Sequence, residues 1–263
     1  MIPITIDGRK LEARENQTVL QVAREHGIDI PTLCSHEALG PHGACRLCIV
    51  EAEGRTLRKG LMASCTLQVS PDMIVETQSP SVVQARKVIF ELLLGRASES
   101  VALKELAEKF GVTSSRFKTE ASEDCVRCGI CIRVCKEQIG VAALCFAGRG
   151  QKKRVTAEFG KLSETCIGCG TCANLCPTGA IQLEDRGDER RIIVKDTVIS
   201  AQPLVPCRQC GSHFQTAKFI AFVRAKSDVE GATEIARDLC PTCTRTAYAD
   251  ALAGASQPAP ARA

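Results

Sequence analysis

The first residues of the chain alternate apolar and polar side chains with the period of a β-strand. Isoleucines alternate with proline or polar residues over residues 2–6, and Asp7-Gly8 is a strong two-residue hairpin turn before a second strand. Residues 17–27 then follow a helical pattern, in which Thr18 can cap the helix. The chain is therefore expected to open with a hairpin and a short helix.

Two later apolar runs predict further strands, one near residues 47–52 and one at residues 73–78. A long loop separates the first of these strands from the helix. Together these elements predict a small sheet wrapped over one helix, which we assign to residues 1–78.

Helical periodicity dominates residues 79–124, which contain no cysteine. Pro80 suits the first position of a helix after Ser79, and apolar residues recur at helical spacing until Gly95. A second helix is expected over residues 100–110. This segment is expected to be a helical connector that packs on the domains before and after it.

Composition adds chemistry to this outline. The 263 residues include 17 cysteines but only three methionines and no tryptophan. Such heavy cysteine use is typical of a secreted disulfide framework or of a metal-thiolate protein, and the spacing favours metal. The N-terminus lacks the pattern of a signal peptide, and no apolar run approaches the ~18 residues of a membrane-spanning helix. We therefore expect a cytoplasmic protein without direct membrane insertion.

Residues 125–184 contain the pattern Cys-x2-Cys-x2-Cys-x3-Cys twice, which is the ligand pattern of a domain with two 4Fe-4S clusters. In the bacterial arrangement the fourth cysteine of each run ligates the other cluster. The first cluster is assigned to Cys125, Cys128, Cys131 and Cys176. The second cluster is assigned to Cys166, Cys169, Cys172 and Cys135.

The long loop of the first domain carries a different cysteine set, Cys-x10-Cys-x2-Cys-x16-Cys. Four thiolates with the middle pair on a tight turn can hold a 2Fe-2S cluster. The set comprises Cys34, Cys45, Cys48 and Cys65. His36 and His42 share this loop and are expected to be loop residues rather than ligands.

Two Cys-x2-Cys knuckles, 29 residues apart, follow in residues 185–251 and predict a tetrahedral four-thiolate site. Its ligands are Cys207, Cys210, Cys240 and Cys243. We expect structural zinc, with iron as the alternative. Residues 217–226 between the knuckles have an amphipathic helical pattern, which fits an all-β rubredoxin core poorly. His213 lies beside the site but is not needed as a ligand.

Four other features have structural interpretations. Pro203 and Pro206 are interpreted as the boundary before the knuckles, and the charged residues 186–191 as a solvated face. Cys145 is interpreted as a buried structural thiol. The proline-rich tail, residues 252–263, is expected to be disordered.

The segments VRCGICIRVCKEQIGVAAL and FGKLSETCIGCGTCANLCPTGAI, together with the ten-residue gap of the N-terminal set, resemble a known family. Its members are the large iron-sulfur subunit of respiratory complex I, the small diaphorase subunit of NAD-reducing hydrogenases, and the N-terminal half of iron-only hydrogenases. In complex I relatives, His and Cys ligands of one additional 4Fe-4S cluster follow the segment resembling VIFELLLG. The corresponding residues 96–112 contain neither residue type, so that cluster is not expected here.

The expected fold class is α+β. It comprises an N-terminal β-grasp 2Fe-2S ferredoxin-like domain (1–78), a helical connector (79–124), a bacterial-type ferredoxin domain with two 4Fe-4S clusters (125–184) and a C-terminal zinc-knuckle module (185–251).

Three such clusters can pass single electrons along a chain. All twelve cluster cysteines are used as ligands and no Gly-rich nucleotide loop follows a strand, so no bond-making site is expected. The resemblance implies a subunit of a hetero-oligomeric oxidoreductase. It would relay electrons between a flavin subunit that handles NAD(H) and a catalytic partner, such as a hydrogenase, a formate dehydrogenase or another low-potential reductase.

Two alternatives remain open. A free ferredoxin-like carrier would need only the clusters and not the connector or the C-terminal module. A redox-sensing zinc module that binds nucleic acid would need an aromatic and basic surface, which the sequence does not offer. The formal net charge of +4 also becomes about −4 if each of the four thiolate sites carries roughly −2. No nucleic-acid partner is therefore expected.

Overall fold

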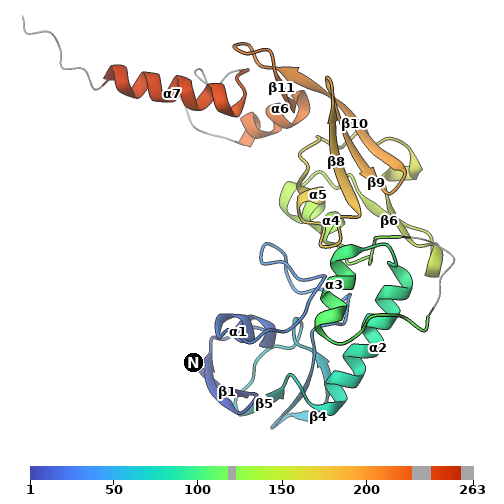
Figure 1. Cartoon of the computed structure of the whole chain (residues 1–263). Coiled ribbons are helices and arrows are strands. Elements are labelled where there is room, and N and C mark those ends of the chain that lie inside the picture. Colours follow the sequence, from blue (N-terminus) through green and yellow to red (C-terminus); the bar gives the residue numbers. More distant parts are fainter. Residues whose placement is uncertain (118–122, 227–237, 256–263) are drawn as a thin grey trace, which may run out of the picture. The chain divides into compact units, whose positions relative to one another are not determined.

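The computed structural model describes residues 1–117, 123–226 and 238–255 of the chain (Figure 1). The chain forms two compact units. Unit 1 comprises Met1–Thr156 and Thr171–Ile181, and unit 2 comprises Ala157–Gly170 and Gln182–Ala263. The division between the units therefore falls inside the second four-cysteine motif. None of the helices in the described ranges is long and apolar enough to cross a membrane.

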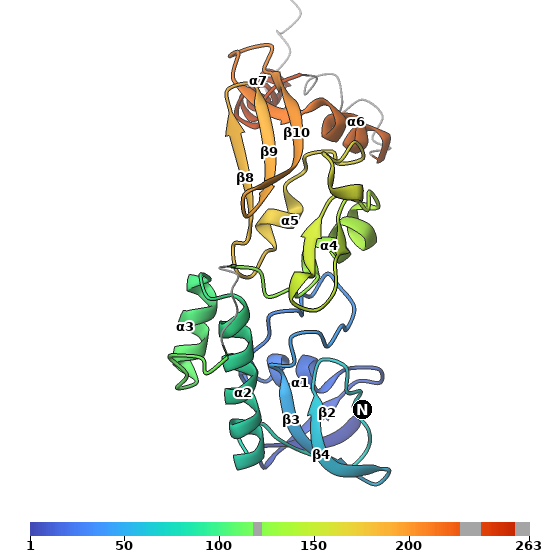
Figure 2. The ribbon, with the colours of Figure 1, turned by 90° about the vertical axis from the view of Figure 1, so that its right-hand side faces the viewer.

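Unit 1 begins with a five-stranded sheet in the order β2-β1-β5-β3-β4. Figure 2 labels β2, β3 and β4 of this sheet. Its paired strands are antiparallel except β1 and β5, which run parallel. The elements are β1 (Ile2–Ile6), β2 (Arg9–Ala13), α1 (Val19–Glu25), β3 (Ile49–Gly54), β4 (Leu57–Ala63) and β5 (Met73–Glu76). The sequence predicts the hairpin, the helix, and strands β3 and β5, whereas β4 has no separate prediction.

The sheet packs on one face of α1, as the apolar pattern predicts. Val22 of the helix and Ile6 and Val50 of the strands are fully buried in one core. Burying each such side chain stabilises the fold by about 1.5–3 kcal/mol. Thr18 forms a capping box with Gln21, which satisfies two backbone N–H groups at the start of the helix.

The connector consists of two helices, α2 (Pro80–Arg96) and α3 (Val101–Lys109). Ser79 and Ser100 cap them through their side-chain oxygens, as the sequence predicts for Ser79. The rings of Phe90 and Phe110 stack 5.3 Å apart. The core of these helices continues into apolar residues around two cysteine sets, such as Leu47 and Ile130. The connector thus packs on both sets.

The rest of unit 1 is built from short elements that follow the first 4Fe-4S motif. They are α4 (Ile130–Arg133), the π-helix η1 (Val134–Ile139), β6 (Cys145–Ala147), the 3-10 helix η2 (Gly150–Lys152), β7 (Arg154–Thr156) and α5 (Thr171–Asn174). The strands β6 and β7 pair antiparallel. Apart from this pair, the described elements here are short helices at or near the cysteine motifs.

Among its described residues, unit 2 contains a four-stranded sheet in the order β11-β10-β9-β8 and the helices α6 and α7. The elements are η3 (Glu158–Gly160), β8 (Ile181–Arg186), β9 (Glu189–Val194), β10 (Thr197–Pro206), β11 (His213–Thr216), α6 (Ala217–Lys226) and α7 (Pro241–Ala255). The helical pattern predicted for residues 217–226 coincides with α6. The tight turn between β10 and β11 carries the first cysteine knuckle.

The structure corrects four interpretations from the sequence. Pro203 lies inside β10 rather than at a boundary, whereas Pro206 is the last residue of the strand, directly before the first knuckle, and coincides with a register shift in the pairing with β11. Arg190, within the run expected to be solvated, is only 8% exposed. Cys145 is partly exposed in β6 rather than buried. The helix α7 continues to Ala255, into the expected tail; residues 256–263 lie outside the described residues.

Candidate iron-sulfur and metal sites

The four N-terminal cysteines lie together in unit 1, and each is at most 5% exposed: Cys34, Cys45, Cys48 and Cys65. Backbone N–H groups point at their sulfurs. Leu33 N donates to Cys45 Sγ at 3.4 Å, and Cys45 N donates to Cys34 Sγ at 3.3 Å. Buried thiolates that accept backbone hydrogen bonds are the donor set that an iron-sulfur cluster requires.

The thiols of this set are close enough to share protons. Hydrogen bonds from the Cys45 and Cys65 thiols lower the pKa of Cys34 to about 2, and the pKa values of Cys45 and Cys65 rise because each donates to Cys34 and is buried. A hydrogen bond from Cys65 lowers the pKa of Cys48 to about 6. The four sulfur atoms are therefore close enough to one another to act together as the thiolate ligands of one 2Fe-2S cluster.

A buried arginine of the connector holds the turn that carries Cys48, directly before β3. Arg86 is 2% exposed, and its guanidinium donates to the carbonyl oxygens of Leu47 (3.3 Å), Ile49 (2.9 Å) and Thr77 (3.2 Å). Burial lowers the pKa of Arg86. In the sequence, Arg86 stands at helical spacing with the apolar Val82 and Ile89. A charged residue at an apolar position was the signal that could have identified it.

The first 4Fe-4S motif lies entirely in unit 1. Burial is the largest cause that raises the pKa of Cys125 and Cys128 to about 12, and the charge of Cys176 contributes to both rises. Burial likewise raises the pKa of Cys131, and the charges of Cys172 and Cys176 are among the smaller causes. Cys176 is thus a neighbour of the first three cysteines of the other motif.

The two motifs have the same backbone conformation. The residue before the second cysteine has a positive φ in both, Arg127 at 56° and Gly168 at 67°. The residue after the second cysteine does so as well, Gly129 at 79° and Gly170 at 76°. A left-handed conformation is costly for a residue such as Arg127 and needs support from its surroundings. The repetition indicates that both loops curl around the same kind of group.

The motifs differ after the fourth cysteine. Lys136 follows Cys135 and keeps its backbone N–H, and the helix continues through it as η1 to Ile139. Pro177 follows Cys176 and has no N–H to donate, and α5 has already ended at Asn174. Cys135 accepts a hydrogen bond from Ala143 N at 3.3 Å.

The second assigned set is divided between the units. Cys135 and Cys172 belong to unit 1, whereas Cys166 and Cys169 belong to unit 2. This set therefore stays a prediction from the sequence. Within unit 2, Gly168 N donates to Cys166 Sγ at 3.4 Å, and Cys166 N donates to Ser163 Oγ at 3.2 Å.

The C-terminal cysteines form a compact site in unit 2. Their sulfur atoms all lie within 4.8 Å of one another, in the set Cys207, Cys210, Cys240 and Cys243. The sulfurs of Cys210 and Cys240 are 3.8 Å apart. A tetrahedron with metal–sulfur bonds of ~2.3 Å has sulfur–sulfur edges of about 3.8 Å. The geometry therefore fits a single tetrahedral ion.

The N–H groups of the knuckles point at these sulfurs as well. Cys240 N donates to Cys207 Sγ at 3.2 Å, and Cys243 N donates to Cys240 Sγ at 3.5 Å. Backbone hydrogen bonds lower the pKa of Cys207 to about 6 and also lower that of Cys240, whereas burial raises the pKa of Cys243 to about 12. His213 is not part of the group of side chains that could hold an ion.

The loop histidines of unit 1 contact protein rather than the cysteine sulfurs. His36 Nδ1 accepts a hydrogen bond from Ala38 N at 3.2 Å. His42 lies against Gly129, where a Cβ would stand 3.3 Å from its Nε2 atom. That neither imidazole is a ligand stays a prediction from the sequence.

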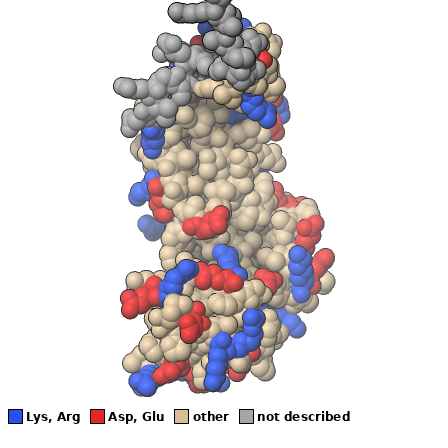
Figure 3. Space-filling model, turned by 90° about the vertical axis from the view of Figure 1, so that its left-hand side faces the viewer, with Lys and Arg blue, Asp and Glu red and all other residues tan. Residues whose placement is uncertain are grey.

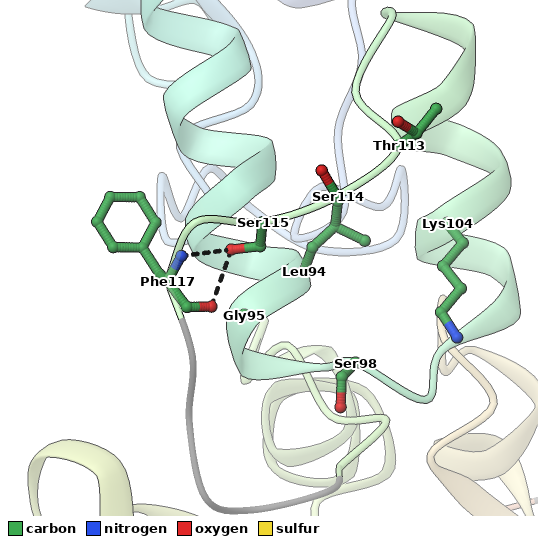
Figure 4. Close-up of a pocket in the computed structure, with 8 residues that line it drawn as sticks. All are labelled: Leu94, Gly95, Ser98, Lys104, Thr113, Ser114, Ser115 and Phe117. Carbon is green, nitrogen blue, oxygen red and sulfur yellow. Dashed lines mark hydrogen bonds between the residues drawn. The ribbon is translucent and has the colours of Figure 1, made fainter.

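The connector has a pocket between the end of α2, the start of α3 and the segment after α3 (Figure 4). Ser115 lines this pocket, and its hydroxyl oxygen accepts a hydrogen bond from Phe117 N at 3.0 Å. The residues that line the pocket are Leu94, Gly95, Ser98, Lys104, Thr113, Ser114, Ser115 and Phe117. None of these lining residues offers a thiol or an imidazole.

Charged side chains are interspersed on the face drawn in Figure 3. Lysine and arginine side chains stand beside aspartate and glutamate there rather than in one basic patch.

Two family models match the chain. The 2Fe-2S iron-sulfur cluster binding domain matches residues 1–80, and the 4Fe-4S binding domain matches residues 162–182. The first match ends close to the domain boundary predicted at residue 78.

Curated proteins similar to the chain include the G 2 subunit of NADH-quinone oxidoreductase from Rhizobium meliloti (strain 1021), which is 30% identical and covers 88% of this chain. The HndD subunit of the NADP-reducing hydrogenase from Solidesulfovibrio fructosivorans is 34% identical and covers 69% of this chain. The aligned parts are 29% and 36% of those proteins, so the chain spans about a third of their length.

A solved structure is also similar, that of an NAD+-reducing NiFe-hydrogenase in the H2-reduced state. One of its chains superposes with a TM-score of 0.59 and 29% sequence identity, over 68% of this chain and 85% of that chain.

Proposed function

We propose that the chain relays single electrons inside a multisubunit oxidoreductase. The premise is that it is an iron-sulfur electron-transfer protein related to the large iron-sulfur subunit of complex I and to subunits of NAD-reducing hydrogenases. Its two partners in this proposal are a flavin subunit that handles NAD(H) and a catalytic redox subunit. The catalytic subunit would be a hydrogenase, a formate dehydrogenase or another low-potential reductase.

Three iron-sulfur groups and one metal ion belong to the proposal. The 2Fe-2S cluster is assigned to Cys34, Cys45, Cys48 and Cys65. The two 4Fe-4S clusters are assigned to the sets Cys125, Cys128, Cys131, Cys176 and Cys166, Cys169, Cys172, Cys135. The knuckles, with the tetrahedral sulfur spacing described above, are assigned zinc. When bound, the clusters accept and release single electrons.

The observation that carries the proposal is the contact between two cysteine sets within unit 1. Arg133 of α4 donates to Gly40 O at 2.9 Å, and Gln138 donates to Ala38 O at 2.6 Å. Residues 38–40 belong to the loop between the first two cysteines of the N-terminal set. The charge of Cys34 in turn raises the pKa of Cys128. The two sets are therefore neighbours, as an electron relay requires.

Buried apolar residues of the connector and of the N-terminal loop pack beside both sets. Leu47 and Phe90 are fully buried in the core that the connector shares with both sets. Exclusion of water and backbone hydrogen bonds to sulfur are the means by which a protein adjusts cluster potentials. In the proposed orientation, the 2Fe-2S domain faces the flavin subunit and the domain with two 4Fe-4S motifs faces the catalytic subunit.

The test is anaerobic purification of the full chain from its native host, followed by single-turnover reduction. We expect a flavoprotein to co-purify with the chain, and NADH to bleach the cluster absorbance only when that flavoprotein is present. A chain that purifies alone and exchanges electrons equally well with unrelated redox proteins would be a free carrier instead. Retention on nucleic acid at physiological salt would instead favour a redox-sensing zinc module that binds nucleic acid.

A further inference from the structure

The second cysteine loop is held by residues far from it in sequence, all within unit 2. Thr216, the last residue of β11, donates its hydroxyl hydrogen to Ile167 O. Arg190 of β9 donates to Gly168 O at 3.2 Å. Both side chains are buried, with 1% and 8% exposure. Two consecutive carbonyl groups of the loop are thus fixed by two buried donors.

The peptide group between Ile167 and Gly168 is fixed on both sides. Its oxygen accepts from Thr216, and its N–H donates to Cys166 Sγ at 3.4 Å. The oxygen and the hydrogen of a trans peptide point in opposite directions. A donor that fixes the oxygen therefore also fixes where the N–H points, and hydrogen bonds in such a chain polarise one another.

Arg190 is itself held in place. Its Nε and Nη2 atoms donate to the two carboxylate oxygens of Asp185 at 2.7 and 2.8 Å, and Nη1 also donates to the side chain of Gln215. Gln215 Oε1 in turn accepts from Thr216 N at 3.0 Å. Thr216 and Arg190 therefore belong to one network. Arg190 and the buried Ile192 are two positions apart in β9, so both side chains lie on the same face of the strand. This spacing was the signal in the sequence for an inward side chain at Arg190.

The contact leaves no space for adjustment. A Cβ at Gly168 would stand 2.6 Å from Thr216 Cγ2, and Gly168 has a φ of +67°. The loop and the threonine side chain are therefore matched in shape as well as in hydrogen bonding.

We propose that Thr216 is a positioning residue that sets the reduction potential of the second 4Fe-4S cluster, by holding the Ile167–Gly168 peptide with its N–H toward the Cys166 sulfur. The inference rests on the proposed function, which assigns a cluster to Cys166. One-electron reduction, by the donor that the proposed function names, adds one negative charge that the sulfur atoms share. An N–H aimed at a sulfur stabilises this more negative form and raises the potential.

The experiment compares Thr216→Val with Thr216→Ser in the full chain. Valine keeps the shape of threonine and removes the hydroxyl, whereas serine keeps the hydroxyl. Thr216 Oγ1 also accepts from Phe219 N at the start of α6, so Ser100→Ala, which removes a helix cap from α3, controls for the loss of a cap. The measurement is an EPR-monitored redox titration of both 4Fe-4S clusters. The signal that Cys166→Ser alters belongs to the second cluster.

We expect Thr216→Val to lower the reduction equilibrium constant of the second cluster about fivefold, which is about 40 mV at 59 mV per tenfold for one electron. Thr216→Ser and Ser100→Ala are expected to stay within about twofold of the wild type. The first 4Fe-4S cluster serves as an internal reference, with an unchanged potential in every variant.

The outcomes separate this inference from the proposed function. A wild-type chain without a second 4Fe-4S cluster overturns both. A chain with both clusters and equal potentials in Thr216→Val and wild type overturns only the inference, and so does an equal shift in Thr216→Ser. If Thr216→Val loses the second cluster while Thr216→Ser retains it, the role of the hydroxyl is supported, whereas loss in both variants contradicts it.

Discussion

The buried guanidinium of Arg86 donates to the carbonyl oxygens of Leu47 and Ile49, the residues on either side of Cys48. The helix α2 thus fixes the turn before β3, which carries one of the N-terminal thiols. No carboxylate among the described residues forms an ion pair with this guanidinium, which donates to three backbone carbonyl oxygens. The connector is for this reason a part of the site and not only a spacer between two domains.

Arg86→Met is expected to lower the free energy of unfolding of the N-terminal domain by about 3 kcal/mol. The substitution leaves three buried carbonyl groups without their donor, and each unsatisfied group costs roughly 1–3 kcal/mol before relaxation. Chemical denaturation followed by visible circular dichroism of the 2Fe-2S site measures the change. Arg55→Met is the matched control, because Arg55 is 82% exposed and its ion pair with Asp72 lies at the surface. Equal effects of the two substitutions would contradict the role of Arg86.

Metal analysis tests the cofactor assignment as a whole. We expect about ten iron atoms and one zinc atom per chain after anaerobic purification, the sum of one 2Fe-2S cluster, two 4Fe-4S clusters and one tetrahedral site. A content near fourteen iron atoms without zinc would place a third 4Fe-4S cluster at the knuckles, against the 3.8 Å spacing of Cys210 and Cys240. A content near eleven iron atoms without zinc would instead mean a single iron ion there.

Much of the architecture could be predicted because regular spacing carried it. The cysteine intervals, the alternation in β1 and the caps at Thr18 and Ser79 each depend on residues close in sequence. The supporting groups could not be assigned in this way. Arg190 reaches Gly168 O across 22 positions and Thr216 reaches Ile167 O across 49, so their roles depend on tertiary packing. The run around Arg190 was interpreted as solvated from its composition alone.

Gly168→Ala is expected to remove most of the second 4Fe-4S cluster and to lower iron from about ten to about six atoms per chain. The new Cβ would meet Thr216 Cγ2 at 2.6 Å. Adding Thr216→Ser removes this methyl group and is expected to restore part of the iron. Gly187→Ala is the matched control: its φ is +63°, but a Cβ there meets nothing within 4 Å. Iron loss of the same size in Gly187→Ala would assign the effect to backbone strain rather than to the contact.

Cys243→Ser is expected to remove the C-terminal metal and to spare the N-terminal site. The four sulfurs lie within 4.8 Å of one another, so one missing thiolate opens the tetrahedron. Zinc should fall from about one atom to nearly none per chain. The visible circular dichroism of the 2Fe-2S site should stay unchanged, because its cysteines lie in unit 1. Cys145→Ser, outside every assigned set, controls for the loss of a thiol. Retention of zinc by Cys243→Ser would contradict the assignment.

The ion pair between Asp185 and Arg190 predicts how the stability of unit 2 responds to pH. The hydrogen bonds from Arg190 lower the pKa of Asp185 below its ordinary value of 3.8. A lowered carboxyl pKa contributes stability that is fully present above the ordinary pKa and is lost as the pH falls through the lowered one. Asp185→Asn should therefore destabilise unit 2 by the same amount at pH 5, 6, 7 and 8. We expect about 1 kcal/mol, because the carboxylate is 39% exposed and solvent screens the pair. Anaerobic chemical denaturation at the four pH values, with Asp188→Asn as the charge control, measures it. A difference that changes steadily between pH 8 and pH 5 would mean that another group titrates with folding, since Asp185 stays ionised throughout this range.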